Sequence, residues 1–443
     1  MRNILAKLHN KLGDFWFDSL MVFVACRAAD VINLFVGLWL VPKYVAPAEL
    51  GAVMPLSSFA SFLVLPIAIF TTAFTKEVNT LATTRKYGEM KTLIRGVFIG
   101  SAVFLIFAIF VAKITLPLFL ERIRITNGSL GIIIIAGAFI GAIAPIYTST
   151  LQALKKFKEF TIVNALGAPI RFLAMLFAMP YRALSGYFVG QAAGPGFSIV
   201  ASLFFLKKEL SVKARPYWSP TTARRFARLL IGVAATTATS SFVSLIEQTI
   251  IRQRLPELDS AAYYMVSRFT EMANLVAVTF SLTLFPYTAE AAANGKSTMS
   301  LVLRAALITF AINIPIAAVF LIFGQPILNL LPHGSEYAAY YWAIPWIIVV
   351  TAISSLSSYH VSTEISAAKF GFLKWYAPFH VICCALLLII TGYGYFTDHL
   401  PNNLTQFLAE HNITSLKAML CWLTIRMLLP VAFSVHDLVR QKP

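Results

Sequence analysis

Long apolar stretches separated by short polar connections run through almost the whole chain. About twelve of them reach the roughly 20 residues that a helix needs to cross the hydrocarbon core of a bilayer. The hydrocarbon core offers no water to unpaired backbone amides, so stretches of this length predict helices and exclude strands. We expect helices at residues 15–41, 50–74, 93–120, 129–152, 160–181, 184–206, 226–251, 260–289, 301–330, 338–365, 373–396 and 414–436.

Charged residues are too few to cover a water-soluble protein of this length. Hydrophobic residues make up 58% of the 443 residues, and charged residues make up 12%. The net charge of +17 comes from Lys and Arg in short connections, not from one stripe or tail, so nucleic acid is not an expected partner. Alternate connections hold most of these cations, and cytoplasmic loops of membrane proteins are the basic ones. The sequence therefore predicts an inner-membrane protein with both termini in the cytoplasm.

Two repeated motifs indicate that the chain consists of two related halves. Ser149-Thr150 followed by Lys156-Phe157 has the same spacing as Ser362-Thr363 followed by Lys369-Phe370. The longest basic connection lies between the two copies. The predicted fold class is an all-α polytopic membrane protein, with about 12 helices in two pseudo-symmetric lobes of six. The predicted parts are an N-terminal lobe at 1–208, a cytoplasmic linker at 209–225 and a C-terminal lobe at 226–443.

A few ionisable residues interrupt the apolar stretches. A charge at the centre of a membrane helix costs about 2.5–3.5 kcal/mol on insertion scales, so it usually faces a cavity or a partner. In two places an arginine precedes a carboxylate by three residues, which puts both side chains on one face of a helix. These pairs are Arg27 with Asp30 and Arg268 with Glu271. Each fits either a structural ion pair or a cavity in which a guanidinium binds phosphate through two parallel hydrogen bonds. The candidate substrate-binding residues are Arg27, Asp30, Arg171, Arg268, Glu271 and Arg426.

Three carboxylates are candidates for coupling to an ion gradient: Asp30, Glu247 and Glu271. Glu247 ends a row of polar residues on the seventh predicted helix, which fits either helix packing or a cavity wall. The sequence contains no nucleotide-binding loop, metal-ligand spacing, hydrolase motif or disulfide pattern. We therefore expect no cofactor, no metal site and no enzyme activity. Transport would be passive or driven by Na⁺ or H⁺.

The segment at 40–51, LVPKYVAPAELG, resembles a stretch of polysaccharide exporters in the multidrug/oligosaccharidyl-lipid/polysaccharide (MOP) superfamily. FTKE at 74–77 and LPHGSEY at 331–337 are similar to two further segments of that family. The resemblance implies a fold like that of the superfamily's multidrug exporters (MATE), with two lobes that work by alternating access. Its O-antigen branch flips undecaprenyl-diphosphate-linked oligosaccharide from the cytoplasmic to the periplasmic leaflet.

This resemblance also implies partners and contacts. The expected substrate is the lipid-linked oligosaccharide, and proteins of polysaccharide assembly are expected as further partners. Related lipid II flippases carry basic cavity residues on their first and eighth helices. By that analogy, Arg27 and Arg268 are the residues expected to contact the diphosphate.

Three other classes of protein compete with this interpretation. The first is an ion-driven multidrug exporter of the same superfamily, but cationic drugs call for an acidic or aromatic cavity, and here the mid-membrane arginines outnumber the acids. A major-facilitator transporter ranks below it, because TRKYGE at 84–89 lacks the aspartate and basic tail of that family's loop. A membrane glycosyltransferase, polymerase or ligase ranks last, because the external loop at 396–412 is short and holds few candidate catalytic residues.

Replacing the predicted diphosphate contacts tests the resemblance in cells. Arg27→Ala and Arg268→Ala should each abolish surface polysaccharide while protein abundance in the membrane stays normal. The corresponding lysine variants should be only partly active, because an ammonium lacks the planar fork of a guanidinium. Normal polymer output from both alanine variants would remove these two residues as substrate ligands.

Overall fold

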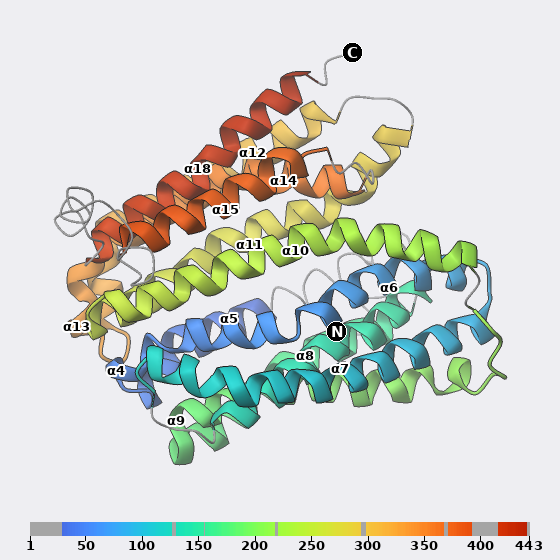
Figure 1. Ribbon diagram of the computed structural model, residues 1–443. Coiled ribbons are helices and arrows are strands. Elements are labelled where there is room, and N and C mark those ends of the chain that lie inside the picture. The colour runs from blue at the N-terminus through green and yellow to red at the C-terminus, as the bar shows by residue number, and fades with distance from the viewer. Residues whose placement is uncertain are drawn as a thin grey trace, which may run out of the picture. The chain divides into compact units, whose positions relative to one another are not determined.

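The computed structural model describes residues 29–125, 130–154, 156–217, 220–293, 298–366, 371–391 and 415–440. All regular secondary structure within these ranges is helical (Figure 1). Residues 29–35 are helical and continue into a π-helical turn at Val36–Leu40. The α-helices that follow are α3 (Val41–Tyr44), α4 (Pro47–Leu50), α5 (Val53–Leu63), α6 (Leu65–Thr83), α7 (Tyr87–Arg122), α8 (Leu130–Ala153), α9 (Phe157–Leu210), α10 (Pro220–Arg254), α11 (Glu257–Ala293), α12 (Met299–Asn329), α13 (Gly334–Tyr337), α14 (Ala343–Ser366), α15 (Leu373–Ile390) and α18 (Leu416–Arg440).

The described helices agree with the predicted spans. Seven of them are long and apolar enough to cross a membrane, and there is an eighth if the segments on either side of Val64 form one span. The predicted span at 50–74 falls on α4, α5 and α6, the spans at 160–181 and 184–206 both fall on α9, and the other spans from residue 93 onwards each overlap one long described helix. The first span is described only from residue 29, and residues 129, 392–396 and 414 of other spans lie outside the described residues. Large apolar side chains on α7 are also exposed, with Ile106 at 72% and Val103 at 63%, as expected for a surface that faces lipid. The all-α polytopic membrane fold is confirmed.

Helix α9 contains two of the predicted spans, and its backbone breaks between them. Arg182 has φ −142° and ψ 26°, and Ala183 has φ 31° and ψ −108°, neither of which is helical. A positive φ is unfavourable for a residue with a Cβ, so this break is a defined corner and not a smooth bend. The corner brings the two limbs of α9 side by side. A Cβ on Gly194 would lie 2.8 Å from the carbonyl oxygen of Gly167, so glycine permits this close approach.

The chain forms two compact units. Unit 1 contains the chain up to Val36, Leu63–Leu118 and Asn127–Ala234. Unit 2 contains Gly37–Phe62, Phe119–Thr126 and Ala235–Pro443. Two short segments of the first half of the chain therefore pack with the second half. The predicted division into lobes at 1–208 and 226–443, joined by a linker at 209–225, stays a prediction.

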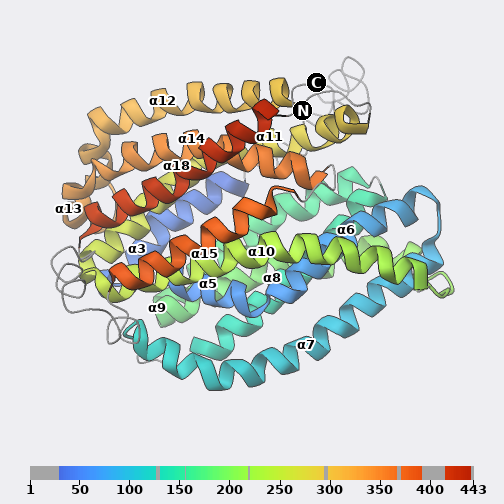
Figure 2. The same cartoon turned by 45° about the horizontal axis from the view of Figure 1, so that its top comes forward.

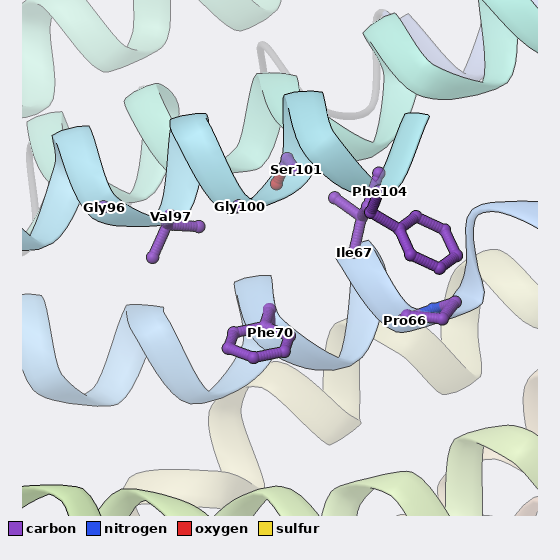
Figure 3. Close-up of a pocket in the computed structure, with 8 residues that line it drawn as sticks. All are labelled: Pro66, Ile67, Phe70, Gly96, Val97, Gly100, Ser101 and Phe104. Carbon is purple, nitrogen blue, oxygen red and sulfur yellow. The ribbon is translucent and has the colours of Figure 1, made fainter. Parts of the chain in front are cut away.

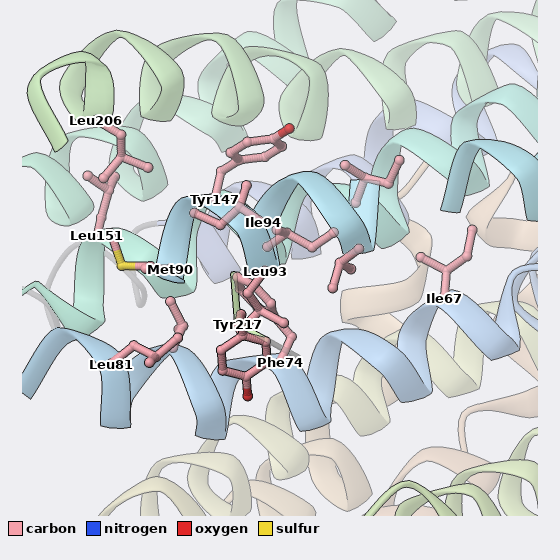
Figure 4. Packing of buried hydrophobic residues seen from close by; sticks show 14 of the residues in the cluster. Ile67, Phe74, Leu81, Met90, Leu93, Ile94, Tyr147, Leu151, Leu206 and Tyr217 are labelled. Atoms are coloured by element: carbon pink, nitrogen blue, oxygen red, sulfur yellow. The ribbon is translucent and has the colours of Figure 1, made fainter. Parts of the chain in front are cut away.

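Unit 1 has its core where α6, α7, α8 and α9 meet (Figure 4). Phe74, Leu93 and Leu206 are fully buried there. Polar contacts fasten the cytoplasmic connection of the predicted topology to this core. The hydroxyl of Tyr217 donates to the buried Glu77 carboxylate at 3.0 Å, and Lys156 pairs with Glu209 at 2.8 Å.

Unit 2 is built around α14, which packs against α11, α12 and α18 (Figures 1 and 2). The hydroxyl groups of Thr309 on α12 and Tyr359 on α14 lie 2.7 Å apart and are buried. Ser434 on α18 donates to Ser357 on α14 at 3.1 Å. Hydroxyl pairs of this kind hold apolar helices together where the hydrophobic effect cannot.

Arg252 ties the three segments of unit 2 together. Its side chain lies at the end of α10 and is 1% exposed. The Nε atom donates to the Ile123 carbonyl at 3.0 Å, and Nη2 donates to the Ala48 carbonyl at 2.7 Å. In the opposite direction, Arg124 Nη2 donates to the Gln253 carbonyl on α10 at 3.2 Å. Both the 37–62 segment and the 119–126 segment are thereby bound to α10.

Arg252→Met should destabilise the protein. The methionine keeps most of the volume but removes two charge-assisted hydrogen bonds and leaves two carbonyls unpaired, which costs about 3 kcal/mol. Thermal unfolding in detergent measures the effect. Lys207→Met is the matched control, because it removes an exposed cation from the last turn of another helix. Equal melting temperatures for the two variants would show that Arg252 does not hold unit 2 together.

Candidate functional site

The structure describes six of the seven residues that the sequence marked as candidates. Asp30 lies half-buried in the helix at 29–35, whereas Arg27 lies outside the described residues. The others lie on four helices: Arg171 on α9, Glu247 on α10, Arg268 and Glu271 on α11, and Arg426 on α18. Arg171 belongs to unit 1, and the last four belong to unit 2.

In unit 1, Arg171 lines a polar cavity of about 290 Å³. The cavity lies among the helix at 29–35, α8 and both limbs of α9. Its polar lining side chains are Asn33, Thr148, Asn164, Arg171 and Ser198. Among the described lining residues there is no carboxylate. The wall therefore offers one permanent cation together with neutral amides and hydroxyls.

The corner in α9 positions the Arg171 guanidinium. Nη1 donates to Gln191 Oε1 at 3.1 Å, and Gln191 Nε2 donates to the Tyr187 hydroxyl at 2.7 Å. Arg171 precedes the corner, and the other two residues follow it. The returning limb thus contacts the guanidinium through a neutral amide.

One acceptor atom of a residue that lines this cavity has no hydrogen-bond donor among the described residues. Asn33 Oδ1 is buried and has no hydrogen-bond partner within the described part of the chain. An unpaired buried acceptor costs about 1–3 kcal/mol unless something donates to it. This atom is closed to a ligand as it stands, whereas Thr148, Asn164 and Ser198 line the cavity and can exchange hydrogen bonds with neutral polar groups beside the Arg171 cation.

In unit 2, Arg268 and Glu271 form the ion pair that their spacing allows. Arg268 Nη1 lies 2.5 Å from Glu271 Oε1, and the guanidinium stacks over the Tyr264 ring at 4.8 Å. A Cβ on residue 37 would lie 2.7 Å from the Arg268 side chain, so the glycine at this position leaves the space that Arg268 occupies. Of the two interpretations offered by the sequence, the structural pair is formed here. A role of either residue in binding substrate or a coupling ion stays a prediction.

Glu247 and Arg426 also form an ion pair, which the sequence did not reveal. Arg426 Nε lies 2.5 Å from Glu247 Oε1, and the Glu247 side chain is 5% exposed. Since Arg426 already neutralises this carboxylate, a coupling cation would have to displace the guanidinium. No sequence signal connects residues so far apart, because nothing in the spacing says that α10 meets α18.

Arg426 also lines a second polar cavity, of about 420 Å³, in unit 2. Four serines line it, together with an aromatic pair in which the Tyr376 and His380 rings stack at 4.3 Å. The row of serines on α14 was visible in the sequence, whereas Tyr376 and His380 on α15 were not singled out. The serines in the lining are Ser354, Ser357, Ser358 and Ser362.

No group of three or more His, Cys, Asp or Glu side chains in the described ranges is arranged to hold a metal ion. Any coupling ion stays a prediction.

The buried pair in unit 2 predicts a strong double-mutant effect. Arg426→Met should destabilise the protein by about 3–5 kcal/mol, because it leaves the Glu247 carboxylate buried without its partner. Adding Glu247→Gln should restore most of the loss, because the second change removes that charge. Thermal melts of the two single variants and the double variant measure the coupling. Additive losses would mean that the two side chains do not interact.

Comparison with known proteins identifies the fold. No family model matches the chain, and no curated protein does. An inward-facing multidrug resistance MATE family transporter of the MOP superfamily is similar over 93% of this chain and 95% of its own, with a TM-score of 0.66 and 13% identity. A mutant of the Vibrio cholerae MATE transporter VcmN covers 98% of this chain and 97% of its own (TM-score 0.64, 13% identity). A MOP superfamily transporter from Pyrococcus furiosus covers 98% of both chains (TM-score 0.61, 12% identity). The chain is therefore a multi-pass membrane protein with the fold of MATE transporters of the MOP superfamily.

Proposed function

We propose that the protein is a secondary transporter that flips an anionic, lipid-linked oligosaccharide across the inner membrane. The substrate class is a polyprenyl diphosphate that carries a short glycan for polysaccharide or O-antigen synthesis. The observation that carries this proposal is the Arg171 cavity, in which one guanidinium lies among amides and hydroxyls and no carboxylate is among the described lining residues.

The chemistry of that cavity matches both parts of such a headgroup. A diphosphate is a strong acceptor, and guanidinium donors bind it through charge-assisted hydrogen bonds. A glycan presents hydroxyl groups, which can exchange hydrogen bonds with Thr148 and Ser198. The positive charge of Arg171 would repel a cationic drug.

The second cavity supports a polar cargo as well. Its serines and the stacked Tyr376–His380 pair offer hydroxyl donors and an aromatic face, the two surfaces on which sugars pack. Arg426 adds a cation to the wall, although Glu247 shares its charge.

The fold supports transport by alternating access. The similar MATE structures include an inward-facing and an outward-facing conformation, with TM-scores of 0.66 and 0.60 to this chain. We extend that cycle to this chain, with both termini in the cytoplasm and with polysaccharide-assembly proteins as partners.

A multidrug exporter is the second candidate, and the fold fits it equally well. Its specific support is that one of the similar structures is a multidrug resistance transporter. Charge argues for the flippase instead. Another similar structure is described as having a binding pocket of reversed polarity and a different function. This is a precedent for changing the cargo on this fold by changing the charge of the pocket.

Transport by the purified protein separates the two candidates. Proteoliposomes would hold a fluorescent polyprenyl-diphosphate oligosaccharide, and a membrane-impermeant quencher would report the fraction left in the outer leaflet. The wild-type protein should speed the exchange. Arg171→Ala should slow the exchange by about tenfold or more, because it removes one charge-assisted hydrogen bond to the headgroup. The rate of Arg171→Lys should fall between those of the wild-type protein and Arg171→Ala.

The control variant is Lys158→Ala, which removes an exposed cation from the same helix. It should keep the wild-type rate. Efflux of a cationic dye by the wild-type protein, without any flipping of the lipid, would contradict the proposal and favour the multidrug exporter.

A further inference from the structure

The cavities of the two units have walls of different chemistry. In unit 1, a cavity of about 240 Å³ between α6 and α7 is lined by apolar side chains, two glycines and the Ser101 hydroxyl (Figure 3). None of these described lining groups gains or loses a proton near neutral pH. In unit 2, the serine-lined cavity of Arg426 adjoins a titratable pair instead, His360 on α14 and Asp437 on α18.

His360 is a buried base without a hydrogen bond. The residue is 1% exposed, and neither Nδ1 nor Nε2 has a hydrogen-bond partner in the described part of the chain. Nε2 lies 3.6 Å from Asp437 Oδ2, which is within the range of an ion pair but too long for a hydrogen bond. A neutral ring leaves both nitrogens unsatisfied here, whereas a protonated ring would attract the carboxylate and donate to it.

Asp437 is held in place for this contact and can reach water. The Trp375 indole on α15 donates from Nε1 to Asp437 Oδ2 at 2.7 Å. The Asp437 side chain is 31% exposed and lies in the last turn of α18, the end that faces the cytoplasm in the predicted orientation. The carboxylate can therefore exchange a proton with water and pass it to the buried ring.

The charges that surround the His360 ring favour its protonated form. Of the described charged groups on α14 and on the helices packed against it, two act on the ring: Glu364 from α14 itself and Asp437 from α18. The contact from α12 is neutral, since the Thr309 hydroxyl pairs with the hydroxyl of the neighbouring Tyr359. An imidazolium at position 360 would thus be attracted by two carboxylates.

The pair is connected to the cavity along α14 and α18, which pack against each other (Figures 1 and 2). One turn before the pair, Ser434 on α18 donates to Ser357 on α14 at 3.1 Å. Three residues separate the two contacts on each helix, so both contacts join the same two helix faces. Ser357 also lines the cavity. A change of charge at His360 is therefore felt about one to two helical turns away, at the cavity wall.

We infer that His360 and Asp437 form a proton-binding site whose occupation strengthens the binding of an anionic cargo in the adjoining cavity. The proton passes from the Asp437 carboxyl group to His360 Nε2, which leaves a carboxylate beside an imidazolium. The pair carries one negative charge before this uptake and none after it. An anion in the cavity is therefore repelled less when the site is occupied. This inference rests on the proposed function, because that proposal supplies the anionic cargo.

Electrostatics sets the size of the effect. Neutralising one charge about 10 Å from the cargo, at an effective dielectric constant of about 20, changes the affinity by about tenfold. Linkage requires the cargo to raise the proton affinity of the site by the same factor. Histidine is the side chain that ordinarily changes charge between about pH 5 and 8, so the effect falls near physiological pH.

The first test observes the proton directly. The full chain is labelled with ¹³C in its histidine rings, placed in nanodiscs and followed by NMR over about pH 5–8. The signal that is missing from His360→Gln should titrate in the wild-type protein. His360→Phe, which keeps the shape of the ring, replaces the glutamine variant if that variant does not fold. A His360 signal that stays constant over this range would overturn the inference.

The second test measures binding of a polyprenyl-diphosphate oligosaccharide at about pH 5.5 and 7.5, on either side of the ordinary histidine pKa. This diphosphate is esterified at both ends, so its charge is the same at both pH values. The wild-type protein should bind it about tenfold more tightly at the lower pH. The His360→Gln and His360→Phe variants should show equal affinities at both pH values.

Two matched variants test whether the effect belongs to His360. His436→Gln removes a 58% exposed ring whose Nδ1 lies 3.9 Å from Asp437 Oδ1, and it should keep the tenfold ratio. His380→Gln removes the titratable ring of the cavity wall itself. It should weaken binding at both pH values and leave the ratio between them unchanged. A ratio that is lost in His380→Gln and kept in His360→Gln would overturn the inference.

The outcomes separate the proton site from the proposed function. Flipping by the wild-type protein, together with equal affinities at both pH values, would overturn the proton site and leave the flippase standing. Tighter binding at acid pH that is lost in His360→Gln, without any flipping by the wild-type protein, would support the proton site and contradict the flippase.

Discussion

A charged side chain within a helical membrane bundle must find a partner, because the hydrocarbon around it supplies none. The described arginines meet this constraint in different ways. Arg268 and Arg426 are held by carboxylates, each at 2.5 Å. Arg171 donates to the neutral Gln191, in a cavity whose described lining has no carboxylate. A guanidinium among amides and hydroxyls suits an anionic headgroup, and the proposed cargo follows from that lining.

The same constraint decides how much could be predicted from the sequence. The helices were predictable, because each apolar stretch must satisfy its own backbone. The Arg268–Glu271 pair was foreseeable as one of two options, because three residues of separation place both side chains on one helix face. The partner of Arg426 was not foreseeable, because ion pairs between distant helices depend on which helices touch. The same applies to Arg252, whose acceptors are carbonyls in two remote segments of the chain.

The cavity of Arg171 lies between these extremes. A basic residue within an apolar stretch was a sound signal for a functional candidate. Its surroundings depend on the corner at Arg182 and Ala183, which falls in the gap between the predicted spans 160–181 and 184–206 but whose geometry the spacing does not specify. Without the corner, Gln191 would lie about 30 Å farther along the helix axis than Arg171. The polar wall of the cavity is therefore a product of tertiary structure.

The fold of this protein does not by itself determine its cargo. At 12–13% identity the chain keeps the MATE fold over nearly its full length, so the arrangement of helices tolerates almost any change of side chains that preserves apolar surfaces. What the protein carries is decided by a few polar positions inside the units. We propose that the charge of those positions selects an anionic lipid over a cationic drug in this protein.

The central claim is that the phosphate charge is recognised by the guanidinium in unit 1. The most direct test is a binding titration of the protein in nanodiscs with a polyprenyl diphosphate and with the same polyprenol lacking phosphate. The account predicts that the diphosphate binds more tightly, that salt weakens the difference, and that Arg171→Ala removes most of it. Equal affinities for the two lipids, or a preference for diphosphate that survives Arg171→Ala unchanged, would contradict it.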